Sequence, residues 1–257
     1  MERRDAQNLR RQSVVVVLLL TLLVANPLQG FSQGVITDDS TTGTNLNLGF
    51  GLPTNSVTVM NGVTINNSDD GSDAVFGNTH PWHLTNNAAT LNGSMNGVRL
   101  DIGGSVDNLT GGIITGGGNG VNINGGPGSV INAGSITGDT SDGVYISGDG
   151  SVDNQWGGII QGNANGVNIT GAGTIINTNT GWIIGVNSDG VYIGGSGSLD
   201  NRGGGIEGGQ YGVEIVGSGS VTNAGLILAD SYDGVRLRAG GNVDIRYSTY
   251  DDASLKV

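Results

Sequence analysis

Cysteine is absent from the 257-residue chain, proline occurs only four times, and aromatic residues make up 5% of the sequence. The lack of cysteine excludes a disulfide scaffold, and the scarcity of proline excludes a collagen-like chain. The chain instead contains 50 glycines and is 36% hydrophobic. Because glycine is costly inside helices, long helices are not expected beyond the N-terminal segment. The composition therefore predicts an all-β protein.

Basic residues are also scarce, with 10 Lys and Arg against 22 Asp and Glu, which gives a formal net charge of -12. Four of the arginines lie within residues 1–32, and Lys256 is the only lysine. Nucleic acid is therefore not expected as a partner, because phosphate binding needs clustered Lys and Arg. Anionic polysaccharides and lipid headgroups meet the same repulsion, and solubility of an exposed surface explains the charge.

The N-terminal segment has the order of a secretory signal peptide. Residues 1–12 are basic, residues 13–25 (SVVVVLLLTLLVA) are almost entirely apolar, and small residues follow with a helix-breaking proline. The apolar stretch of 13 residues is shorter than the roughly 20 needed to span a bilayer, so a cleaved signal is favoured over an uncleaved anchor. We predict a signal peptide over residues 1–32, cleaved after Gly30 or Ser32, and export of the remaining chain.

From Gly97 onward the motif Gly-Val-x-Ile/Leu recurs at intervals of 22–24 residues. Its glycines are Gly97, Gly120, Gly143, Gly166, Gly190, Gly212 and Gly234. A second apolar ladder follows in each repeat and comprises Val106, Val130, Val152, Ile175, Leu199, Val221 and Val243. A third ladder comprises Ile113, Ile136, Ile159, Ile183, Ile206 and Ile227. Each repeat is therefore expected to contain three short β segments separated by Gly-rich corners.

Such short segments cannot bury their apolar sides alone, so the repeats are stable only when they stack on one another. Strand side chains alternate between two faces, which sends Val98 and Leu100 inward and Arg99 outward. Parallel crossovers are right-handed by general preference. The sequence thus predicts a right-handed parallel β-helix solenoid with three short strands per coil of 22–24 residues, regular over residues 97–245.

The repeat weakens outside this range. Residues 62–65 (GVTI) resemble the first strand of a coil but lie 35 residues before Gly97, which predicts one coil with an inserted loop around residues 79–83 (THPWH). We assign residues 33–96 to an N-terminal cap with irregular first coils, because an open coil would expose strand edges. Residues 246–257 form a predicted C-terminal tail.

An asparagine recurs two residues after the second apolar ladder in successive repeats. These asparagines are Asn108, Asn132, Asn154, Asn177, Asn201 and Asn223. Asparagine tolerates left-handed corner conformations and can hydrogen-bond along a stack with its like. We predict a structural asparagine ladder at a corner, in preference to a glycosylation or ligand site.

Aspartates alternate with uncharged residues in two further columns. The aspartates of the first column are Asp107, Asp153, Asp200 and Asp244, and the uncharged residues between them are Ile131, Ile176 and Thr222. The aspartates of the second column are Asp142, Asp189 and Asp233, and they alternate with Asn119, Asn165 and Tyr211. Adjacent coils of a β-helix lie about 4.8 Å apart, so the charges are expected about 9.6 Å apart, close to a Debye length. The alternation therefore predicts reduced repulsion between carboxylates.

Segments such as GSVINAGSI and GSVTNAGLI accompany the GVxI strands and the signal peptide. With these features residues 97–244 resemble the passenger region of a Gram-negative autotransporter, or a related pectin-lyase-like β-helix surface protein, and residues 33–96 do so loosely. The resemblance implies the β-helix fold and a location at the cell surface, the outer membrane or outside the cell. It identifies the fold better than the function.

Autotransporters also carry a C-terminal outer-membrane barrel, and the sequence departs from the family there. Even eight strands with their turns need about 100 residues, whereas 13 residues follow Asp244. We therefore expect a truncated autotransporter, or a protein that is released or held at the outer membrane by a separate anchor.

Catalytic residues are not expected. A polygalacturonase-like β-helix enzyme would show a Gly-His-Gly motif with paired aspartates, whereas the only histidines, His80 and His83, lie outside the regular repeats. A pectate-lyase-like enzyme would use a basic residue near carboxylates and calcium. The candidates for that residue are Arg99, Arg202, Arg236 and Arg238. Asp101 follows Arg99 by two positions, but ordinary outward strand positions are the favoured explanation of Arg99 and Arg236.

Cofactor and metal sites are not expected either. His80 and His83 lack further ligands at a recognisable spacing. The segments GDGSVDN and GSGSLDN faintly resemble a calcium nonapeptide, but their period is 22–24 residues, and aspartates about 9.6 Å apart cannot share one ion. Trp156 and Trp182 would either stack on sugars or pack at a corner, and corner packing is favoured.

These observations favour an exported, non-enzymatic β-helix module that serves in adhesion or interaction at the cell surface, or as a spacer. Its expected partner is an unknown surface, host or extracellular ligand. The alternative is a polysaccharide-active β-helix enzyme, either a lyase or a hydrolase.

Overall fold

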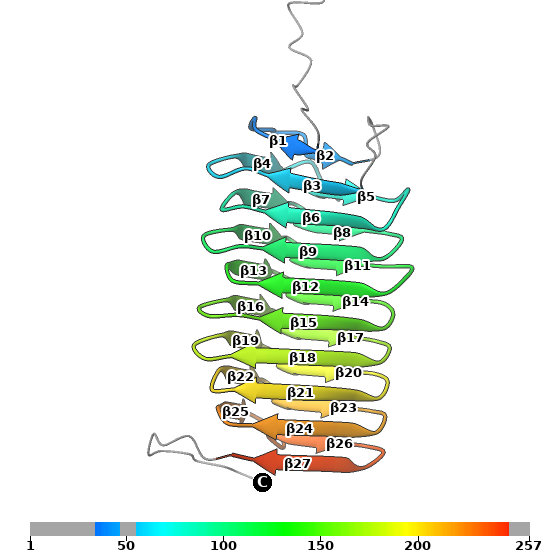
Figure 1. Cartoon of the computed structure of the whole chain (residues 1–257), viewed down its shortest axis with the longest axis vertical. Coiled ribbons are helices and arrows are strands. Elements are labelled where there is room, and N and C mark those ends of the chain that lie inside the picture. Colours follow the sequence, from blue (N-terminus) through cyan, green and yellow to red (C-terminus); the bar gives the residue numbers. More distant parts are fainter. Residues whose placement is uncertain (1–33, 47–54, 247–257) are drawn as a thin grey trace, which may run out of the picture. The chain divides into compact units, whose positions relative to one another are not determined.

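The computed structural model describes residues 34–46 and 55–246, and every regular element in these ranges is a β-strand. The strands coil into a parallel β-solenoid of about nine turns (Figure 1). The all-β class predicted from the glycine content is therefore confirmed. The predicted signal peptide over residues 1–32 and nearly all of the predicted tail lie outside the described residues.

Three parallel sheets run the length of the solenoid, and each full coil contributes one strand to each. Sheet A contains β1 (Val35–Ile36), β3 (Ser56–Val59), β6 (Trp82–Asn86), β9 (Gly104–Asn108), β12 (Gly128–Asn132), β15 (Gly150–Asn154), β18 (Gly173–Thr178), β21 (Gly197–Arg202), β24 (Gly219–Asn223) and β27 (Gly241–Ile245). Sheet B contains β4 (Thr64–Asn67), β7 (Thr90–Gly93), β10 (Ile113–Gly116), β13 (Ser135–Gly138), β16 (Ile159–Gly162), β19 (Trp182–Gly185), β22 (Gly205–Gly208) and β25 (Leu226–Ala229). Sheet C contains β2 (Thr44–Asn45), β5 (Val75–Gly77), β8 (Val98–Leu100), β11 (Val121–Ile123), β14 (Val144–Ile146), β17 (Val167–Ile169), β20 (Val191–Ile193), β23 (Val213–Ile215) and β26 (Val235–Leu237).

The chain visits sheets A, B and C in turn, and we name the connecting segments the A–B, B–C and C–A corners. In Figure 1 the strands of sheet A run leftward on the near side, and those of sheet C run rightward behind them as the chain descends. This sense of coiling is right-handed, as predicted from the general preference of parallel crossovers.

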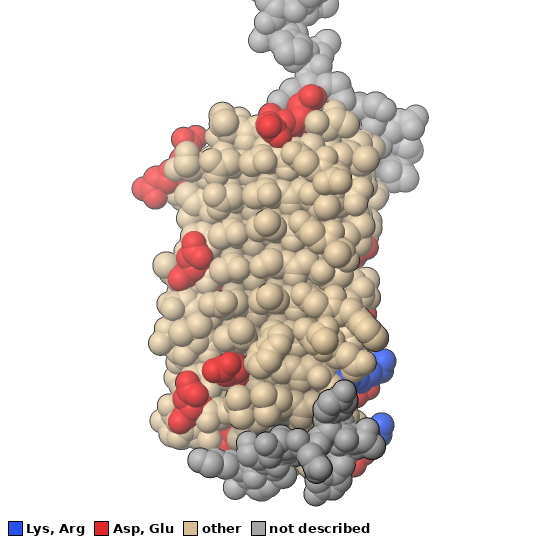
Figure 2. Space-filling model, turned by 90° about the vertical axis from the view of Figure 1, so that its left-hand side faces the viewer, with Lys and Arg blue, Asp and Glu red and all other residues tan. Residues whose placement is uncertain are grey.

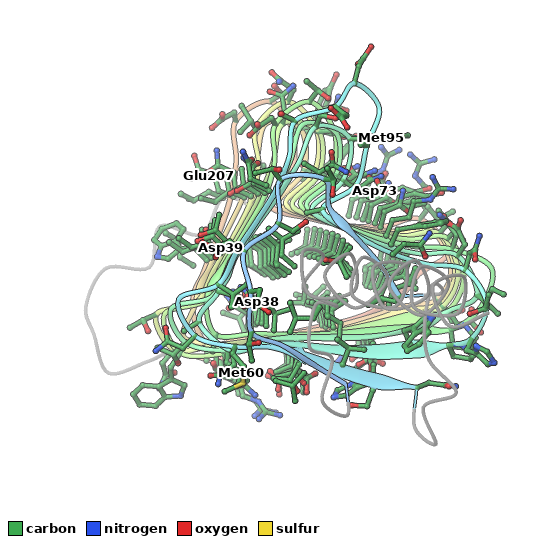
Figure 3. The ribbon with its side chains drawn as sticks, turned by 90° about the horizontal axis from the view of Figure 1, so that it is seen from above. Asp38, Asp39, Met60, Asp73, Met95 and Glu207 are labelled. Atoms are coloured by element: carbon green, nitrogen blue, oxygen red, sulfur yellow. The ribbon has the colours of Figure 1, made fainter. Side chains whose placement is uncertain are left out.

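Continuous apolar columns fill the interior. Val121 from sheet C, Val130 from sheet A and Ile136 from sheet B are each 0% exposed, and each pairs in register with an apolar residue of the next coil. Viewed down the axis, the inward side chains form stacks inside the three sheets (Figure 3). Burial of each such side chain contributes about 1.5–3 kcal/mol, so stacking supplies the core that a single coil lacks.

Residues 34–46 provide an incomplete first coil. Its strands β1 and β2 begin sheets A and C, and Ser40 forms an isolated bridge with Ile65 of sheet B. The Asp39 carboxylate accepts a hydrogen bond of 2.7 Å from the N–H of Thr64, and Asp38 and Asp39 lie on the sheet B side when the solenoid is viewed down its axis (Figure 3). This coil therefore covers backbone N–H and C=O groups of the next coil that a bare end of the solenoid would expose.

The predicted inserted loop around residues 79–83 is wrong. The GVTI segment leads into β4 of sheet B, whereas the strand equivalent to Val98–Leu100 is Val75–Gly77, in direct register with it. Gly77 takes the place of Leu100 in this register, and the indole of Trp82 fills the space where a side chain on Gly77 would sit. This coil is regular, but its strand in sheet C ends in glycine where the other coils have leucine or isoleucine, and an inward tryptophan fills the space. The repeat motif therefore did not detect it.

The prediction of the third apolar ladder is also wrong by one residue in two coils. Ile113 and Ile159 point outward and are 44% and 42% exposed, whereas Ile114 and Ile160 are 0% exposed and pair with Ile136. The A–B corner varies in length, so counting from the preceding ladder does not distinguish two neighbouring isoleucines.

This register predicts a sharp difference between two adjacent substitutions. Ile114→Ala should lower the free energy of unfolding by about 2–5 kcal/mol, because it leaves a cavity in the buried column. Ile113→Ala should lower it by less than about 1 kcal/mol, because its side chain already meets water. Urea unfolding followed by circular dichroism measures both, and equal losses would contradict the observed register.

Candidate functional site

A column of buried asparagine side chains runs along the A–B corners, where the strands of sheet A end. The column consists of Asn86, Asn108, Asn132, Asn154, Asn177, Asn201 and Asn223, each at most 5% exposed. From Asn86 to Asn201, each side-chain amide donates to the side-chain oxygen of the next asparagine at 2.8–3.0 Å. The amide groups also reach corner carbonyls, as Asn154 does to Gly158 at 3.0 Å. The column therefore fixes the corner backbone and satisfies its buried carbonyls.

Two features of this column differ from the prediction. Asn86 extends it by one coil, and the signal was present in the sequence because Asn86 follows the inward Leu84 by two residues. Apart from glycines, the described residues with a positive φ are Ala88 and Thr180, so the asparagines do not use left-handed conformations. Their amide donors and acceptor, rather than their backbone tolerance, suit this position.

A second column of aspartate and asparagine side chains runs along the B–C corners. The side-chain oxygens of Asn119, Asp142, Asn165 and Asp189 each accept a backbone N–H from the following coil at 2.9–3.2 Å. Asp142 and Asp189 are only 5% and 4% exposed, whereas Asp233 is exposed. The alternation of charge does separate the carboxylates, but two of them are buried acceptors of the backbone rather than solvent-facing charges.

Burial raises the pKa of Asp189 to about 6, against the opposing hydrogen bond from the N–H of Tyr211. In the folded state the carboxyl group therefore stays protonated to a higher pH than its usual pKa of 3.8 would allow. The stability associated with this proton is complete below the usual pKa and is lost as the pH rises through the folded value. The ionised carboxylate consequently weakens the fold at neutral pH.

Asp189→Asn should raise the free energy of unfolding at pH 7 by about 1–3 kcal/mol, because the amide keeps the acceptor oxygen without the charge. The gain should disappear near pH 4, which urea unfolding at both pH values measures. Asp149→Asn is the matched control, since Asp149 also accepts a backbone N–H, from Ala172 at 2.8 Å, but is exposed. An equal gain at both pH values would contradict the burial argument.

Arg99 and Asp101, considered as a lyase pair, lie together on sheet C. The guanidinium of Arg99 contacts the carboxylate of Asp101 at 2.8 Å and that of Asp73 at 3.8 Å, and it lies 5.2 Å from the ring centroid of Phe76. The arginine is thus held by two local carboxylates and an aromatic ring. This arrangement stabilises neighbouring coils and leaves the same carboxylates occupied.

The other candidate arginines lie elsewhere. Arg202 pairs with Asp200 at 2.7 Å at the end of β21 in sheet A. Arg236 and Arg238 both contact Glu214, at 3.3 Å and 2.8 Å, on the sheet C side near the last described coil. The four arginines therefore do not converge on one site.

The two histidines also have separate partners. Nδ1 of His80 lies 2.9 Å from the hydroxyl of Thr79. On the outer face of sheet A, Nδ1 of His83 lies 2.6 Å from Oγ of Ser105 and its Nε2 lies 3.5 Å from a carboxylate oxygen of Asp107. No group of three or more His, Cys, Asp or Glu side chains in residues 34–46 and 55–246 has the geometry to hold a metal ion.

The contact of His83, Ser105 and Asp107 has the residue types of an acyl-transfer triad. It lies on the outward face of sheet A, where the backbone N–H and C=O groups of β6 and β9 are used in the hydrogen bonds between parallel strands. Stabilisation of an oxyanion, which usually contributes most to such catalysis, needs donors aimed at one point. The geometry therefore supports a polar contact between coils rather than a nucleophilic site.

A hollow of about 350 Å³, which we call the corner hollow, opens along the A–B corners of consecutive coils. Its aromatic and polar lining residues are Thr110, Asp153, Gln155, Trp156, Thr178 and Arg202.

Trp156 is 70% exposed, so the predicted corner packing is wrong for this residue. Trp182 is 37% exposed and lies over Gly205 of the next coil, which fits partial packing. On the side of the solenoid drawn in Figure 2, Asp and Glu side chains are scattered among uncharged ones, and Lys or Arg side chains lie near one edge.

The described residues thus define a parallel β-solenoid with three sheets, an internal asparagine column and one polar, aromatic-lined hollow among its features. No protein-family model, curated protein or solved structure matches the chain. Within the described ranges, no helix is long and apolar enough to cross a membrane.

Proposed function

We propose that the protein is an exported, non-enzymatic β-solenoid that acts at the cell surface as an interaction module or spacer. In this role it would be comparable with the passenger region of an autotransporter or a related pectin-lyase-like surface protein. The observation that carries the proposal is the distribution of the reactive side chains. Arg99, Arg202 and His83 lie on different parts of the solenoid, and each is engaged by a local partner.

The repeated scaffold also suits a spacer. About nine turns at about 4.8 Å each extend roughly 40 Å, and the asparagine column runs through seven of the coils. A rigid rod of this kind presents side chains at fixed spacing along its faces. The predicted signal peptide over residues 1–32 adds the route out of the cytoplasm.

Cell fractionation with protease treatment of intact cells tests the location. The protein should be found outside the cytoplasm with its N-terminus beginning at residue 31 or 33, after cleavage at Gly30 or Ser32. Recovery solely from the cytoplasm with residues 1–32 retained would refute the proposed export.

A polysaccharide-active enzyme is the competing function, favoured by the cluster of Arg99, Asp101 and Asp73. We expect no cleavage of uronate or neutral glycans by the purified protein, with or without calcium. Reproducible cleavage that is abolished by Arg99→Ala or Asp101→Asn would reverse the ranking of the two functions.

A further inference from the structure

The corner hollow is built on a fixed backbone. The N–H of Gly158 donates to the carbonyl of Gln155 at 2.9 Å and closes the turn that carries Trp156. The N–H of Gln155 donates to the carbonyl of Asn132 in the preceding coil at 2.7 Å, and Asn154 beside it belongs to the buried asparagine column. The turn is thus tied to its neighbours on both sides, and Trp156 is displayed from a preorganised position.

Trp156 offers a large aromatic surface to the solvent. Its side chain is 70% exposed and lines the hollow, although burial of an indole is strongly favourable. No packing role within the described solenoid accounts for this exposure. An aromatic plane beside a polar hollow is the arrangement that stacks against a flat, partly apolar ligand.

The polar side chains of the hollow include an incompletely satisfied carboxylate. One oxygen of Asp153, Oδ2, accepts a hydrogen bond of 3.1 Å from the side-chain amide of Gln155. The other, Oδ1, is shielded from solvent and has no hydrogen-bond partner among the described residues. Such an oxygen is unfavourable unless a donor reaches it. Asp153 lines the hollow, so rotation of its side chain would bring this oxygen to a hydroxyl group of a bound ligand, and that hydroxyl group would supply the donor.

Donors of the hollow complement this acceptor. Arg202 keeps its Nε on Asp200 at 2.7 Å and carries four further N–H bonds on the same guanidinium. The side-chain amide of Gln155 has a second N–H to donate and an oxygen that accepts. The hydroxyl of Thr178 donates to the carbonyl of Asn154 at 3.2 Å and can accept a hydrogen bond from the ligand. Gln155, Thr178 and Arg202 each follow the asparagine of their coil, so they lie in one row at about 4.8 Å per coil.

The combination selects a class of ligand. The Asp153 carboxylate and the net charge of -12 disfavour an anion, and the Arg202 guanidinium disfavours a cation. A cation cage would also surround its ligand with several aromatic rings, whereas Trp156 is the one aromatic residue that lines this hollow. Mixed donors and acceptors beside one aromatic plane suit a neutral, hydroxyl-rich ring.

We propose that the corner hollow binds a neutral saccharide. Trp156 stacks on one face of a sugar ring, Asp153 accepts hydrogen bonds from its hydroxyl groups, and Arg202, Gln155 and Thr178 contact the rest of the ligand. The hollow volume of about 350 Å³ lies in the range of small-ligand sites. This inference rests on the proposed function and deepens it, because it gives the surface module a ligand class.

The test uses the full-length protein on an array of neutral oligosaccharides of glucose, galactose, mannose and N-acetylglucosamine, with uronate oligosaccharides and choline on the same array. The best-bound oligosaccharide is then titrated by calorimetry and tryptophan fluorescence. We expect binding to a neutral saccharide that weakens at least tenfold in Trp156→Ala and in Asp153→Asn. Asp107→Asn and Trp182→Ala are matched controls, since Asp107 occupies the same column as Asp153 and neither control residue lines the hollow.

Unfolding midpoints of all four variants show whether the fold is kept, and Asp153→Asn retains side-chain volume if Trp156→Ala proves unstable. The inference is overturned by absence of saccharide binding, by preference for uronates or choline, or by equal binding of Asp153→Asn and its control. If the protein is exposed at the cell surface but binds no saccharide, the inference fails and the proposed function stands. If it binds saccharide through Trp156 but remains in the cytoplasm, the proposed function fails and the hollow keeps its ligand.

Discussion

Asn154→Ala should lower the free energy of unfolding by about 3–5 kcal/mol. Asn154 is fully buried, accepts from Asn132 at 2.9 Å and donates to Asn177 at 2.9 Å. It also donates to the carbonyls of Gly158 and Trp182 at 3.0 and 3.1 Å. Alanine leaves these buried groups without a partner, and no water is expected to replace a side chain in a closely packed column. Urea unfolding followed by circular dichroism measures the loss.

Asn163→Ala is the matched control, because Asn163 is exposed and contacts Asn187 on the outside of the next coil. Its substitution should change the unfolding free energy by less than about 0.5 kcal/mol. Because solenoids can unfold in parts, hydrogen exchange at the corner amides should accompany the urea experiment. Equal stability of the two variants would mean that the asparagine column contributes packing but little hydrogen-bond energy.

The fold could be predicted because parallel stacking places equivalent residues in direct register. Val98 pairs with Val121 and Val121 with Val144, so the spacing of the Gly-Val-x-Ile motif is the spacing of the coils themselves. Alternation within each strand then separates core from surface. Both features depend on residue type and periodicity alone, which a sequence displays.

Corner lengths could not be predicted in the same way. Ile136 follows Asn132 by four positions, whereas Ile114 follows Asn108 by six. The corners do not repeat with the coil, because glycine-rich turns of different length can join the same two strands. Which of Ile113 and Ile114 faces inward therefore depends on pairing with neighbouring coils.

The candidate site was hidden for a related reason. Asp153, Thr178 and Arg202 come together only after three coils stack, and the exposure of Trp156 depends on the shape of its turn. The contact between His83 and Ser105 joins residues one coil apart, but it could be predicted only after β6 was recognised as a regular strand. Residue types were visible in the sequence, whereas their convergence required the corners.

Replacing Ile131 and Ile176 together with aspartate should lower the free energy of unfolding by about 4 kcal/mol or more at low salt. Asp107, Ile131, Asp153, Ile176 and Asp200 are in direct register in consecutive strands of sheet A. The double variant creates four new pairs of neighbouring carboxylates in this column. Each pair at about 4.8 Å costs about 1–3 kcal/mol before salt screening.

The double variant Ile131→Asn with Ile176→Asn is the control, because it removes the same apolar side chains without adding charge. Both isoleucines are partly exposed, so the difference between the aspartate and asparagine variants should shrink in about 1 M sodium chloride, where the screening length falls to about 3 Å. It should also shrink below about pH 4, where aspartate becomes protonated. Urea midpoints across salt and pH measure these differences. If the two variants are equally stable at low salt, the carboxylates are not neighbours and the stacking register of sheet A is wrong. A difference that persists at high salt would instead place the new charges in the interior, beyond the reach of ions.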